Sequence, residues 1–300
     1  MKQLLHLLSV ASLACSSALA QSPSMTKYDA SEMLTESARI SDLTFPSTTV
    51  ELGMFSKFSN VLFRPSGTGK DQRFPALVLL HSCGPFRDRE TRYWVQAALD
   101  KGYVALPVDS LRGYETNCIF PLRVESGRRI KDAFDALRHL ARLPFIDASR
   151  IYVAGFSQGA FIASLASSAE VASAFAEAPA VRYSAAVGFY GHCQYPAGSI
   201  RGIPYQIDIV RKDIDRPLLL LMGQLDNETP PATCESVLPL LKSAGAPVEA
   251  HIYPDTTHCW DCVTLDGRSK TDFRGVQIIY RFDKSVTENS RQRMFDFFAR

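Results

Sequence analysis

The chain has 300 residues, of which 46% are hydrophobic and 21% are charged, as in an ordinary globular protein with enough apolar residues for a full core. The formal net charge is +2 and the lysines and arginines form no block, which argues against a nucleic-acid partner. Length and composition thus favour one large domain, and charge identifies no binding partner.

The first twenty residues are typical of a secretory signal peptide. Lys2 supplies a positive start, residues 4–14 form a short apolar run, and residues 18–20 are a small-x-small cleavage site. The mature chain is therefore predicted to begin near Gln21 and to be secreted or periplasmic. The apolar run is shorter than the roughly 20 residues of a membrane span, so no stable membrane insertion is expected. A lipoprotein signal at Cys15 is the weaker alternative, because the residues before it fit that motif poorly.

Six cysteines remain after the signal peptide, and an even number in an exported protein indicates disulfides. Three bridges among six cysteines allow 15 connectivities, and the spacing alone does not choose among them. The six are Cys83, Cys118, Cys193, Cys234, Cys259 and Cys262.

Residues 21–50, which are rich in Ser and Thr, are predicted to form a surface extension, and residues 51–300 the main domain. Within that domain, apolar or alternating runs predict strands, and apolar residues at helical spacing predict helices. The predicted strands are residues 76–80, 103–108, 150–156, 183–190 and 218–222, with edge strands at residues 59–64 and 248–253. The predicted helices are residues 90–101, 123–143, 231–244 and segments after residues 159 and 285.

This alternation of strands and helices with short connections predicts an α/β fold with a doubly wound, mostly parallel sheet. In such a sheet the functional site lies beyond the carboxyl ends of the strands. The polar motifs of this chain follow predicted strands at that end, so we expect them to meet there.

Four local predictions accompany these elements. His139 lies about 180° from the apolar face of its helix and is expected to face solvent. Pro239 predicts a kink or an early break within the helix that contains it. Ser285-Val-Thr-Glu288 matches a capping box at the start of the last helix. Residues 191–216 contain no clear amphipathic helix, which predicts a loop without a large lid and an open cleft.

The stretch from Arg150 to Gly159 is the most informative in the chain. An apolar strand pattern breaks into Gly155-Phe-Ser-Gln-Gly159 and runs on into a helix, which is typical of a nucleophile elbow. In an elbow the serine sits on a strained turn, and small flanking residues let neighbouring backbones approach. Without the flanking strand and helix, the same five residues would equally indicate a surface turn. With both flanks present, Ser157 is the predicted nucleophile.

A serine hydroxyl becomes a good nucleophile only when a histidine takes its proton, and an acid must orient that histidine. In elbow hydrolases the chain order is serine, acid, histidine, which leaves His251 and His258 as bases. His251 lies inside an alternating strand, whereas His258 lies in the loop beyond that strand. The predicted base is therefore His258.

The predicted acid is Asp226, which stands just beyond the most apolar strand. A simple turn aspartate is the structural alternative for this position. Asp255 is too close in sequence to His258 to be the easier choice, and Asp213 and Asp215 precede their strand and are expected at the opposite edge. Position therefore favours Asp226.

Backbone amides are expected to hold the oxyanion of a tetrahedral intermediate. One is the N–H of Gln158, directly after the nucleophile, and the other is predicted at Cys83, with Ser82 next in order. His81 is expected to hold this loop by packing or hydrogen bonding.

Aromatic residues near the predicted site suggest an apolar wall for a substrate, although such residues more often fill cores. The predicted substrate contacts are Tyr114, Phe156 and Trp260, with Phe86 and Tyr190 nearby.

Four short stretches at the ends of predicted strands carry a family resemblance. They are Leu79-Leu-His-Ser-Cys-Gly84, Gly155-Phe-Ser-Gln-Gly159, Gly223-Gln-Leu-Asp226 and Tyr253-Pro-Asp-Thr-Thr-His258. Together they resemble the dienelactone hydrolase family of α/β-hydrolases, over roughly residues 50–300. The resemblance implies a mainly parallel sheet of about eight strands, hydrolysis of esters or lactones, and no metal or organic cofactor.

Two departures from the family pattern limit what the resemblance implies. The family's namesakes carry a cysteine nucleophile where Ser157 stands, and the glycine that usually follows the oxyanion-loop histidine is Ser82 here. We therefore carry over the fold and the triad positions but not dienelactone as the substrate.

The strand order of the family also implies a cysteine pairing. Cys83 and Cys118 would follow neighbouring strands, as would Cys193 and Cys234, which leaves a short-range pair in Cys259-x-x-Cys262. These bridges would brace the oxyanion loop, the Asp226 loop and the His258 loop. A redox or zinc motif at the last pair is the alternative, but no second cysteine pair with metal-site spacing accompanies it.

The sequence thus predicts a secreted serine hydrolase that cleaves small-molecule carboxylic esters or lactones through Ser157, Asp226 and His258, by way of an acyl-enzyme and without a cofactor. A peptidase or acyltransferase on the same triad is the second hypothesis. The absence of an extra propeller-sized domain argues against the peptidase. The third hypothesis is an inactive binding protein with this fold. The presence of Ser157, Asp226 and His258 in the required order argues against it. The residues indicate no oligomeric state.

Overall fold

The computed structural model describes residues 26–27, 33–53, 58–66, 72–118, 122–175, 177, 181–200, 203–272 and 274–300. The predicted signal peptide, residues 1–20, lies outside the described residues, as does Cys15.

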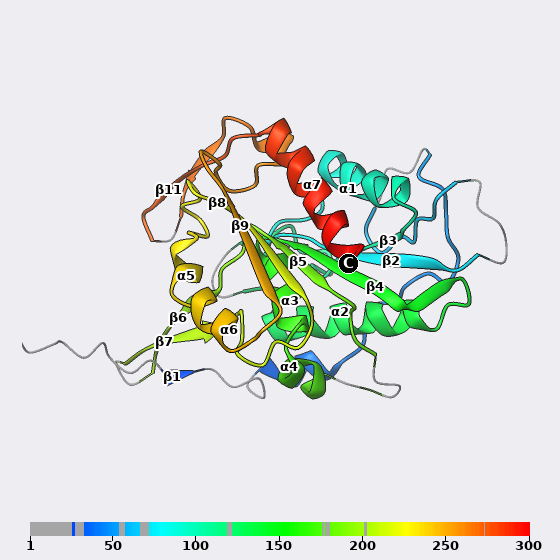
Figure 1. Cartoon of the computed structure of the whole chain (residues 1–300), viewed down its shortest axis with the longest axis horizontal. Helices are drawn as coiled ribbons and strands as arrows, with labels where there is room; N and C mark the ends of the chain where they lie inside the picture. The colour runs from blue at the N-terminus through cyan, green and yellow to red at the C-terminus, as the bar shows by residue number, and fades with distance from the viewer. Residues whose placement is uncertain are drawn as a thin grey trace, which may run out of the picture.

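A six-stranded parallel sheet forms the centre of the described chain (Figure 1), in the order β3-β2-β4-β5-β8-β9. From β2 the chain moves outward to β3 and then returns to build the rest of the sheet on the other side, so the fold is doubly wound. The topological switch point lies between β2 and β4, which is where such sheets place their sites. The strands are β2 (Phe74–Leu80), β3 (Val104–Val108), β4 (Ile146–Phe156), β5 (Ala186–Phe189), β8 (Leu218–Gly223) and β9 (Val248–Tyr253).

The predicted α/β fold is confirmed, but the sheet has six strands in the described residues and not about eight. Residues 59–64, predicted as an edge strand, contribute only isolated bridges, of which one joins Phe63 to Ala105 of β3 in antiparallel fashion. The edge position predicted for β9 is correct.

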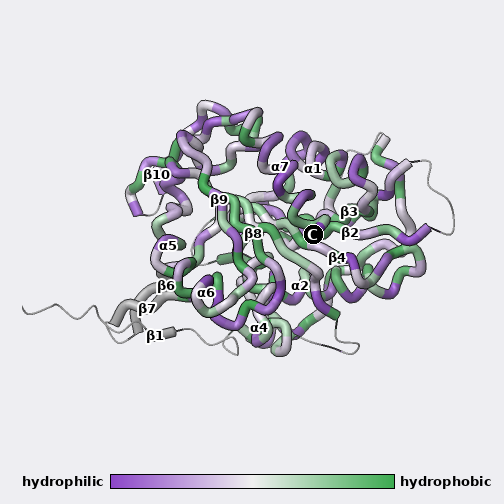
Figure 2. The backbone as a smooth tube through the Cα atoms, in the orientation of Figure 1, coloured by the Kyte–Doolittle hydropathy of each residue, from purple (hydrophilic) through white to green (hydrophobic). Residues whose placement is uncertain are grey.

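Helices cover both faces of the sheet (Figure 1). On one face lie α1 (Asp88–Asp100) and α7 (Lys284–Phe298), and on the other lie α2 (Ser126–Ala141), α3 (Gln158–Ala166) and α4 (Ala169–Ala174). Because side chains alternate along a strand, β2 sends Val78 into the core under α2 and Leu77 and Leu79 into the core under α1. Figure 2 shows the resulting hydrophobic sheet between outer segments that are more hydrophilic.

The segment before the domain packs against α2 and is not merely a surface extension. Met33 and Ala38 are buried there, and a Cβ on Gly127 of α2 would lie 1.9 Å from the carbonyl oxygen of Met33.

The prediction that His139 faces solvent is wrong, because its Nε2 lies 2.8 Å from the carbonyl oxygen of Pro46 and its ring packs beside Phe45. Helical spacing identified the face turned away from the sheet, and the N-terminal segment then covers that face.

Residues 191–216, predicted as a loop, contain an antiparallel hairpin of β6 (Gln194–Ile200) and β7 (Ile203–Asp208). The hairpin is closed at its base by a hydrogen bond from the amide of Ile209 to the carbonyl of Cys193. The short β1 (Thr26–Lys27) adds to β7 in parallel. The prediction of an irregular loop is therefore wrong.

The C-terminal quarter confirms the predicted break in one helix and corrects the predicted cap of another. The helix predicted over residues 231–244 is broken into α5 (Ala232–Glu235) and α6 (Leu238–Ser243), and Pro239 lies in the first turn of α6, where a missing N–H leaves no helical bond unmade. The cap of α7 is Asp283, whose carboxylate accepts a hydrogen bond from the amide of Val286, so the capping box predicted at Ser285 is wrong. The remaining elements are η2 (Ser37–Arg39), η3 (Val263–Leu265), β10 (Ser269–Thr271) and β11 (Gln277–Ile279).

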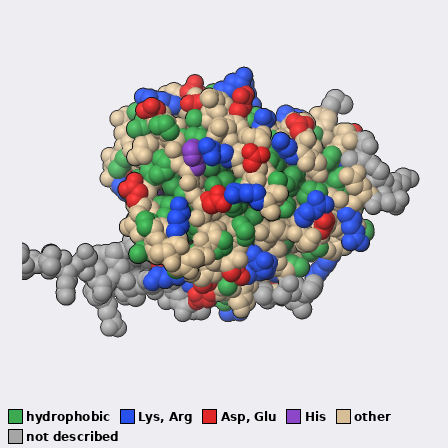
Figure 3. Space-filling model, viewed as in Figure 1, with side chains coloured by type: hydrophobic (Ala, Val, Ile, Leu, Met, Phe, Trp, Pro, Cys, Tyr) green, Lys and Arg blue, Asp and Glu red, His purple; other side chains and the backbone are tan. Residues whose placement is uncertain are grey.

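On the face shown in Figure 3, acidic and basic side chains are interspersed and neither sign covers a large area. None of the helices among the described residues has both the length and the apolar character that crossing a bilayer requires.

Candidate active site

Ser157 lies at the sharp turn between β4 and α3, with a φ of 52° in the left-handed region. Crowding explains the flanking glycines. A Cβ on Gly155 would lie 2.0 Å from the carbonyl oxygen of Gly159, and a Cβ on Gly159 would lie 2.2 Å from the carbonyl oxygen of Leu80. The second contact also presses the start of α3 against the loop after β2. The turn thus has the strained backbone and the close approaches of a nucleophile elbow.

The structure brings the three predicted triad residues into one hydrogen-bonded row. Nε2 of His258 lies 3.1 Å from Oγ of Ser157, and Nδ1 of the same ring lies 2.7 Å from Oδ2 of Asp226. All three side chains are buried. Two independent loops, one after β8 and one after β9, meet the elbow to make this row. The arrangement suits proton transfer from the hydroxyl to the imidazole, with the carboxylate holding the ring in place.

Asp226 is an ionised acceptor in this row. Its Oδ1 accepts hydrogen bonds from the amides of Glu228 and Thr229, at 2.9 and 2.8 Å. Burial by itself would raise the pKa of Asp226, but the charge of His258 and the hydrogen bonds from His258 and Thr229 hold that pKa below its usual value.

The pKa of His258 is raised. Burial by itself would lower it, but the carboxylates of Asp226 and Glu228 outweigh burial. Oε2 of Glu228 lies 3.8 Å from Nε2 of His258, and the same carboxylate accepts hydrogen bonds from Lys270 and Tyr280, each at 2.7 Å. Glu228 therefore lets the buried ring carry a positive charge more easily.

Sequence reasoning missed Glu228 and Thr229. The hydroxyl of Thr229 lies 2.6 Å from Oδ2 of Asp226 and 2.8 Å from the carbonyl oxygen of Tyr190, between the acid and β5. Both residues follow Asp226 within three positions, and this short spacing is the only signal of them that the sequence carries.

The other candidate acids and bases lie away from this row. His251 lies on β9 beside Tyr253. Asp213 accepts hydrogen bonds from Ser168 and the amide of Glu170 at the start of α4, and Asp215 pairs with Arg182. These last two carboxylates thus stabilise the opposite end of the sheet, where their position before β8 placed them.

The loop after β2, which carries Ser82 and Cys83, is held beside the elbow. His81 accepts a hydrogen bond at Nε2 from the amide of Ser110, while its Nδ1 lies 2.9 Å from the carbonyl oxygen of Gly84. Burial lowers the pKa of His81 well below its usual value, so the ring is neutral and donates from Nδ1. The predicted holding role of His81 agrees with these contacts.

Arg129, on α2, joins this loop to the elbow and was also missed. Its guanidinium donates to the carbonyl oxygen of His81 at 2.6 Å and to the side-chain amide oxygen of Gln158. Burial is the main cause that lowers the pKa of Arg129, to about 10, which still leaves it charged at neutral pH. One buried cation therefore sets the distance between the two segments predicted to supply oxyanion donors, Cys83 and Gln158.

The six described cysteines lie in the three pairs that the family resemblance implies, Cys83–Cys118, Cys193–Cys234 and Cys259–Cys262. The sulfurs of the last pair and the carboxylate of Asp261 lie within 4.8 Å of one another, as the ligands of a metal site would. Sulfurs bonded to each other are not the thiolates that bind zinc, and Asp261 already accepts from Trp94 and Tyr190. The zinc interpretation of this motif does not fit the paired sulfurs.

A cavity of about 50 Å³, partly open to solvent, lies beside the elbow. Its lining includes Phe156, one of the predicted substrate contacts, and Ser82 of the oxyanion loop, but not Ser157 itself. Tyr114 is not among the lining residues, and its side chain is 49% exposed. Trp260 is fully buried among Tyr190 and other aromatic rings, so the predicted substrate contact of Trp260 is wrong. Its position in a loop suggested that the ring was available to a substrate, but in the structure this loop places the ring in the core.

The doubly wound sheet, the elbow and the serine, histidine and aspartate in one row define an α/β-hydrolase. The family model of the dienelactone hydrolase family matches residues 59–300, and the chain belongs to this family. It is a hydrolase of carboxylic esters. No curated protein matches the chain.

Solved structures share the fold. A protein of Klebsiella pneumoniae assigned as a dienelactone hydrolase has a TM-score of 0.56 and 20% identity, and the match covers 79% of this chain and 90% of that one. The propionate-bound esterase 2 of Thermogutta terrifontis has a TM-score of 0.56 and 17% identity, over 80% of this chain and 88% of that one. The same esterase phosphorylated by paraoxon has a TM-score of 0.55 and 17% identity, over 79% of this chain and 86% of that one.

Proposed function

We propose that this protein hydrolyses small carboxylic esters through a Ser157–His258–Asp226 triad and an acyl-enzyme. The observation that carries the proposal is the position of His258, whose two ring nitrogens lie within hydrogen-bond distance of Ser157 and Asp226 at once. This geometry supports a tautomer in which Nδ1–H donates to the carboxylate and Nε2 accepts from the serine hydroxyl.

The reaction then proceeds in two halves. Ser157 Oγ attacks the ester carbonyl as its proton passes to Nε2 of His258, and backbone amides of Gln158 and the Ser82–Cys83 loop hold the oxyanion. The imidazolium returns the proton to the leaving alcohol, and Asp226 and Glu228 stabilise it meanwhile. In the second half, water attacks the acyl-enzyme with His258 again as base, which releases the acid and free enzyme.

Hydrolysis of p-nitrophenyl esters tests the proposal. We expect the mature protein to hydrolyse esters of short acyl chains at pH 7 to 8, and we expect Ser157→Ala to reduce this activity to background. Ser157→Ala removes only the hydroxyl, so its melting temperature serves as the folding control. A folded wild-type protein that hydrolyses no ester in the panel would move the assignment to an acyltransferase, a peptidase or a binding protein.

Labelling of the nucleophile gives a second readout that needs no correct guess of the substrate. Esterase 2 of Thermogutta terrifontis is phosphorylated by paraoxon. We expect paraoxon to phosphorylate this protein once, at Ser157, as located by mass mapping of its peptides. Label on another residue, or none in the folded protein, contradicts an activated Ser157.

We also propose that the protein is exported and that its three cysteine pairs are oxidised in the mature form. Residues 1–20 carry a signal-like pattern, and disulfides persist in oxidising compartments. Expression of the full chain in a bacterium with a periplasm, followed by N-terminal sequencing and mapping of unreduced peptides, tests both statements. We expect a mature N-terminus near Gln21 and three disulfide-linked peptide pairs. A cytoplasmic protein that keeps Met1 and free thiols would refute the proposal.

A further inference from the structure

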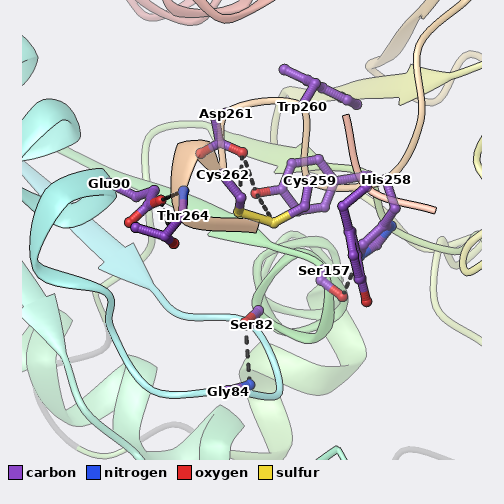
Figure 4. Close-up of a disulfide and its surroundings, with 12 residues drawn as sticks. Ser82, Gly84, Glu90, Ser157, His258, Cys259, Trp260, Asp261, Cys262 and Thr264 are labelled. Atoms are coloured by element: carbon purple, nitrogen blue, oxygen red, sulfur yellow. Dashed lines mark hydrogen bonds between the residues drawn. A yellow bond between two sulfur atoms is a disulfide. The ribbon is translucent and has the colours of Figure 1, made fainter. Parts of the chain in front are cut away.

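The Cys259–Cys262 disulfide is part of the wall of the cavity beside the elbow. Both cysteines line this cavity, and both are nearly buried, with 7% and 6% of their surface exposed. In Figure 4 the disulfide faces the space bounded by Ser82, Ser157 and Glu90. A substrate group that enters the cavity therefore meets the two sulfurs.

Most of the exposed surface of the cavity is apolar, although Arg87, Glu90 and Asp261 also belong to its lining. Aromatic rings of Phe86, Trp94 and Phe156 contribute to it, with Leu79 and the disulfide. Divalent sulfur is polarizable and packs well against aromatic and aliphatic groups, as the thioether of methionine does. The exposed apolar surface of the cavity is the kind that binds an acyl chain or a single ring.

We expect the cavity to lie on the acyl side of the reaction centre, because its lining contains neither His258 nor Glu228. His258 must protonate the leaving alcohol, so the alcohol leaves near Nε2, where Glu228 and its partner Lys270 provide a polar setting. In Figure 4 His258 lies on one side of Ser157, and Ser82, which lines the cavity, lies on the other. The acyl group stays bound to Ser157 Oγ through both halves of the reaction, and the apolar cavity is the space available to it.

The segment that carries the disulfide is also held by other bonds. Asp261 accepts hydrogen bonds from Trp94 Nε1 at 2.7 Å and from the Tyr190 hydroxyl at 2.8 Å. Glu90 accepts from the amide and the hydroxyl of Thr264, at 2.9 and 2.7 Å. These bonds join the segment to α1 and to the residue after β5. Removal of the sulfurs should therefore leave the segment in place and enlarge the cavity.

We propose that this cavity receives the apolar acyl group of the ester and that the Cys259–Cys262 disulfide, as part of its wall, limits the size of that group. The inference rests on the proposed esterase function and adds the substrate class, which is esters of small apolar acids. It assigns the disulfide a role in specificity besides any bracing of the His258 loop.

The test compares acyl groups at constant leaving group. The p-nitrophenyl esters of acetic, butyric, octanoic and benzoic acid are assayed with the wild type, with Cys259→Ala/Cys262→Ala and with the matched control Cys193→Ala/Cys234→Ala. The control removes a disulfide that is more deeply buried, with 0% and 1% of its cysteines exposed, and that does not line the cavity. The readout is kcat/KM for the larger esters relative to acetate, because this ratio is insensitive to the fraction of active enzyme.

We expect Cys259→Ala/Cys262→Ala to raise the relative kcat/KM for octanoate and benzoate by about tenfold, the discrimination typical of one or two methylene groups in an apolar pocket. The control should keep the wild-type ratio. An unchanged ratio in the cavity variant, or an equal rise in the control, overturns the proposal.

A second variant covers the case in which the alanine pair does not fold. Phe86→Ala enlarges the same cavity without touching a disulfide, and we expect it to raise the same ratio; an unchanged ratio shows that acyl groups do not enter this cavity and overturns the proposal. The proposed function fails in a different way, through absence of Ser157-dependent hydrolysis of every ester by the wild type.

Discussion

Oε2 of Glu228 lies 3.8 Å from Nε2 of His258, the ring nitrogen that also faces Ser157. The imidazole therefore has a carboxylate near each nitrogen, with Asp226 at Nδ1. Both carboxylates raise the pKa of the ring, and the positive charge of Lys270 lowers it. Removal of any of these charges should therefore shift the pH dependence of the activity.

Glu228→Gln should shift the acidic limb of the kcat/KM profile to lower pH. The base must be neutral to accept the serine proton, so activity falls as the pH drops through the pKa of His258. Removal of the Glu228 charge lowers that pKa, and the enzyme then stays active at lower pH.

The matched variant with the opposite sign is Lys270→Met, which removes a cation and should move the same limb to higher pH. Identical limbs in Glu228→Gln and the wild type would show that Glu228 does not influence the titration of His258.

Thr229→Val should lower kcat/KM by about tenfold, whereas Thr229→Ser should retain most of it. The hydroxyl lies between Asp226 Oδ2 and the carbonyl oxygen of Tyr190. Its loss leaves these buried acceptors with one donor fewer, which costs about 1 to 3 kcal/mol. The acid then orients the base less well. Steady-state kinetics with p-nitrophenyl acetate measures the effect, and equal losses in the valine and serine variants would argue against the role of the hydroxyl.

Arg129→Met should lower kcat with little change in KM. The guanidinium donates to the carbonyl of His81 and to the side chain of Gln158, so its loss frees the loop and the elbow to move relative to each other. Oxyanion donors act in the transition state, and their displacement therefore affects kcat.

Urea unfolding of Arg129→Met should show a loss of about 2 kcal/mol, since two buried acceptors lose their donor. A rise in KM at unchanged kcat would instead indicate that Arg129 acts on substrate binding.

Gly159→Ala should yield little folded or active protein. The new Cβ would lie 2.2 Å from the carbonyl oxygen of Leu80 and 2.6 Å from that of His81, and both are backbone atoms that cannot move without shifting β2 or its loop. Gly53→Ala is the matched control, because nothing lies within 4 Å of its Cβ position. Soluble yield, circular dichroism and melting temperature compare the two variants. Wild-type stability and activity in Gly159→Ala would disprove the crowding at the elbow.

Local sequence patterns were sufficient for most of the fold. Continuous apolar runs such as residues 218–222 mark strands buried on both faces, and their alternation with helices leaves a parallel, doubly wound sheet as the simple solution. The elbow pattern is also local in sequence, and Gly155 is required by crowding within the turn, although Gly159 is required by the backbone of Leu80 and His81. The positions of Ser157, Asp226 and His258 after successive strands likewise agree with the order serine, acid, histidine along the chain of elbow hydrolases.

The sequence pattern was insufficient where a distant segment decides the environment of a residue. Periodicity turned His139 away from the sheet correctly, but only the folded chain lays Pro46 over that face. Trp260 lies close to His258 in a loop, yet its ring is fully buried in the core. The neighbouring Asp261 accepts hydrogen bonds from Trp94 and Tyr190, which lie far away in the sequence.

The sequence by itself thus determined the class of fold and predicted the nucleophile and the order of its partners, because each depends on spacing within a strand, a turn or a helix. Tertiary structure decided that Glu228 faces His258, that Arg129 joins the oxyanion loop to the elbow, and that the Cys259–Cys262 pair faces a cavity. Those relationships join segments far apart in the chain, and their distances exist only once the sheet has brought its strand ends together.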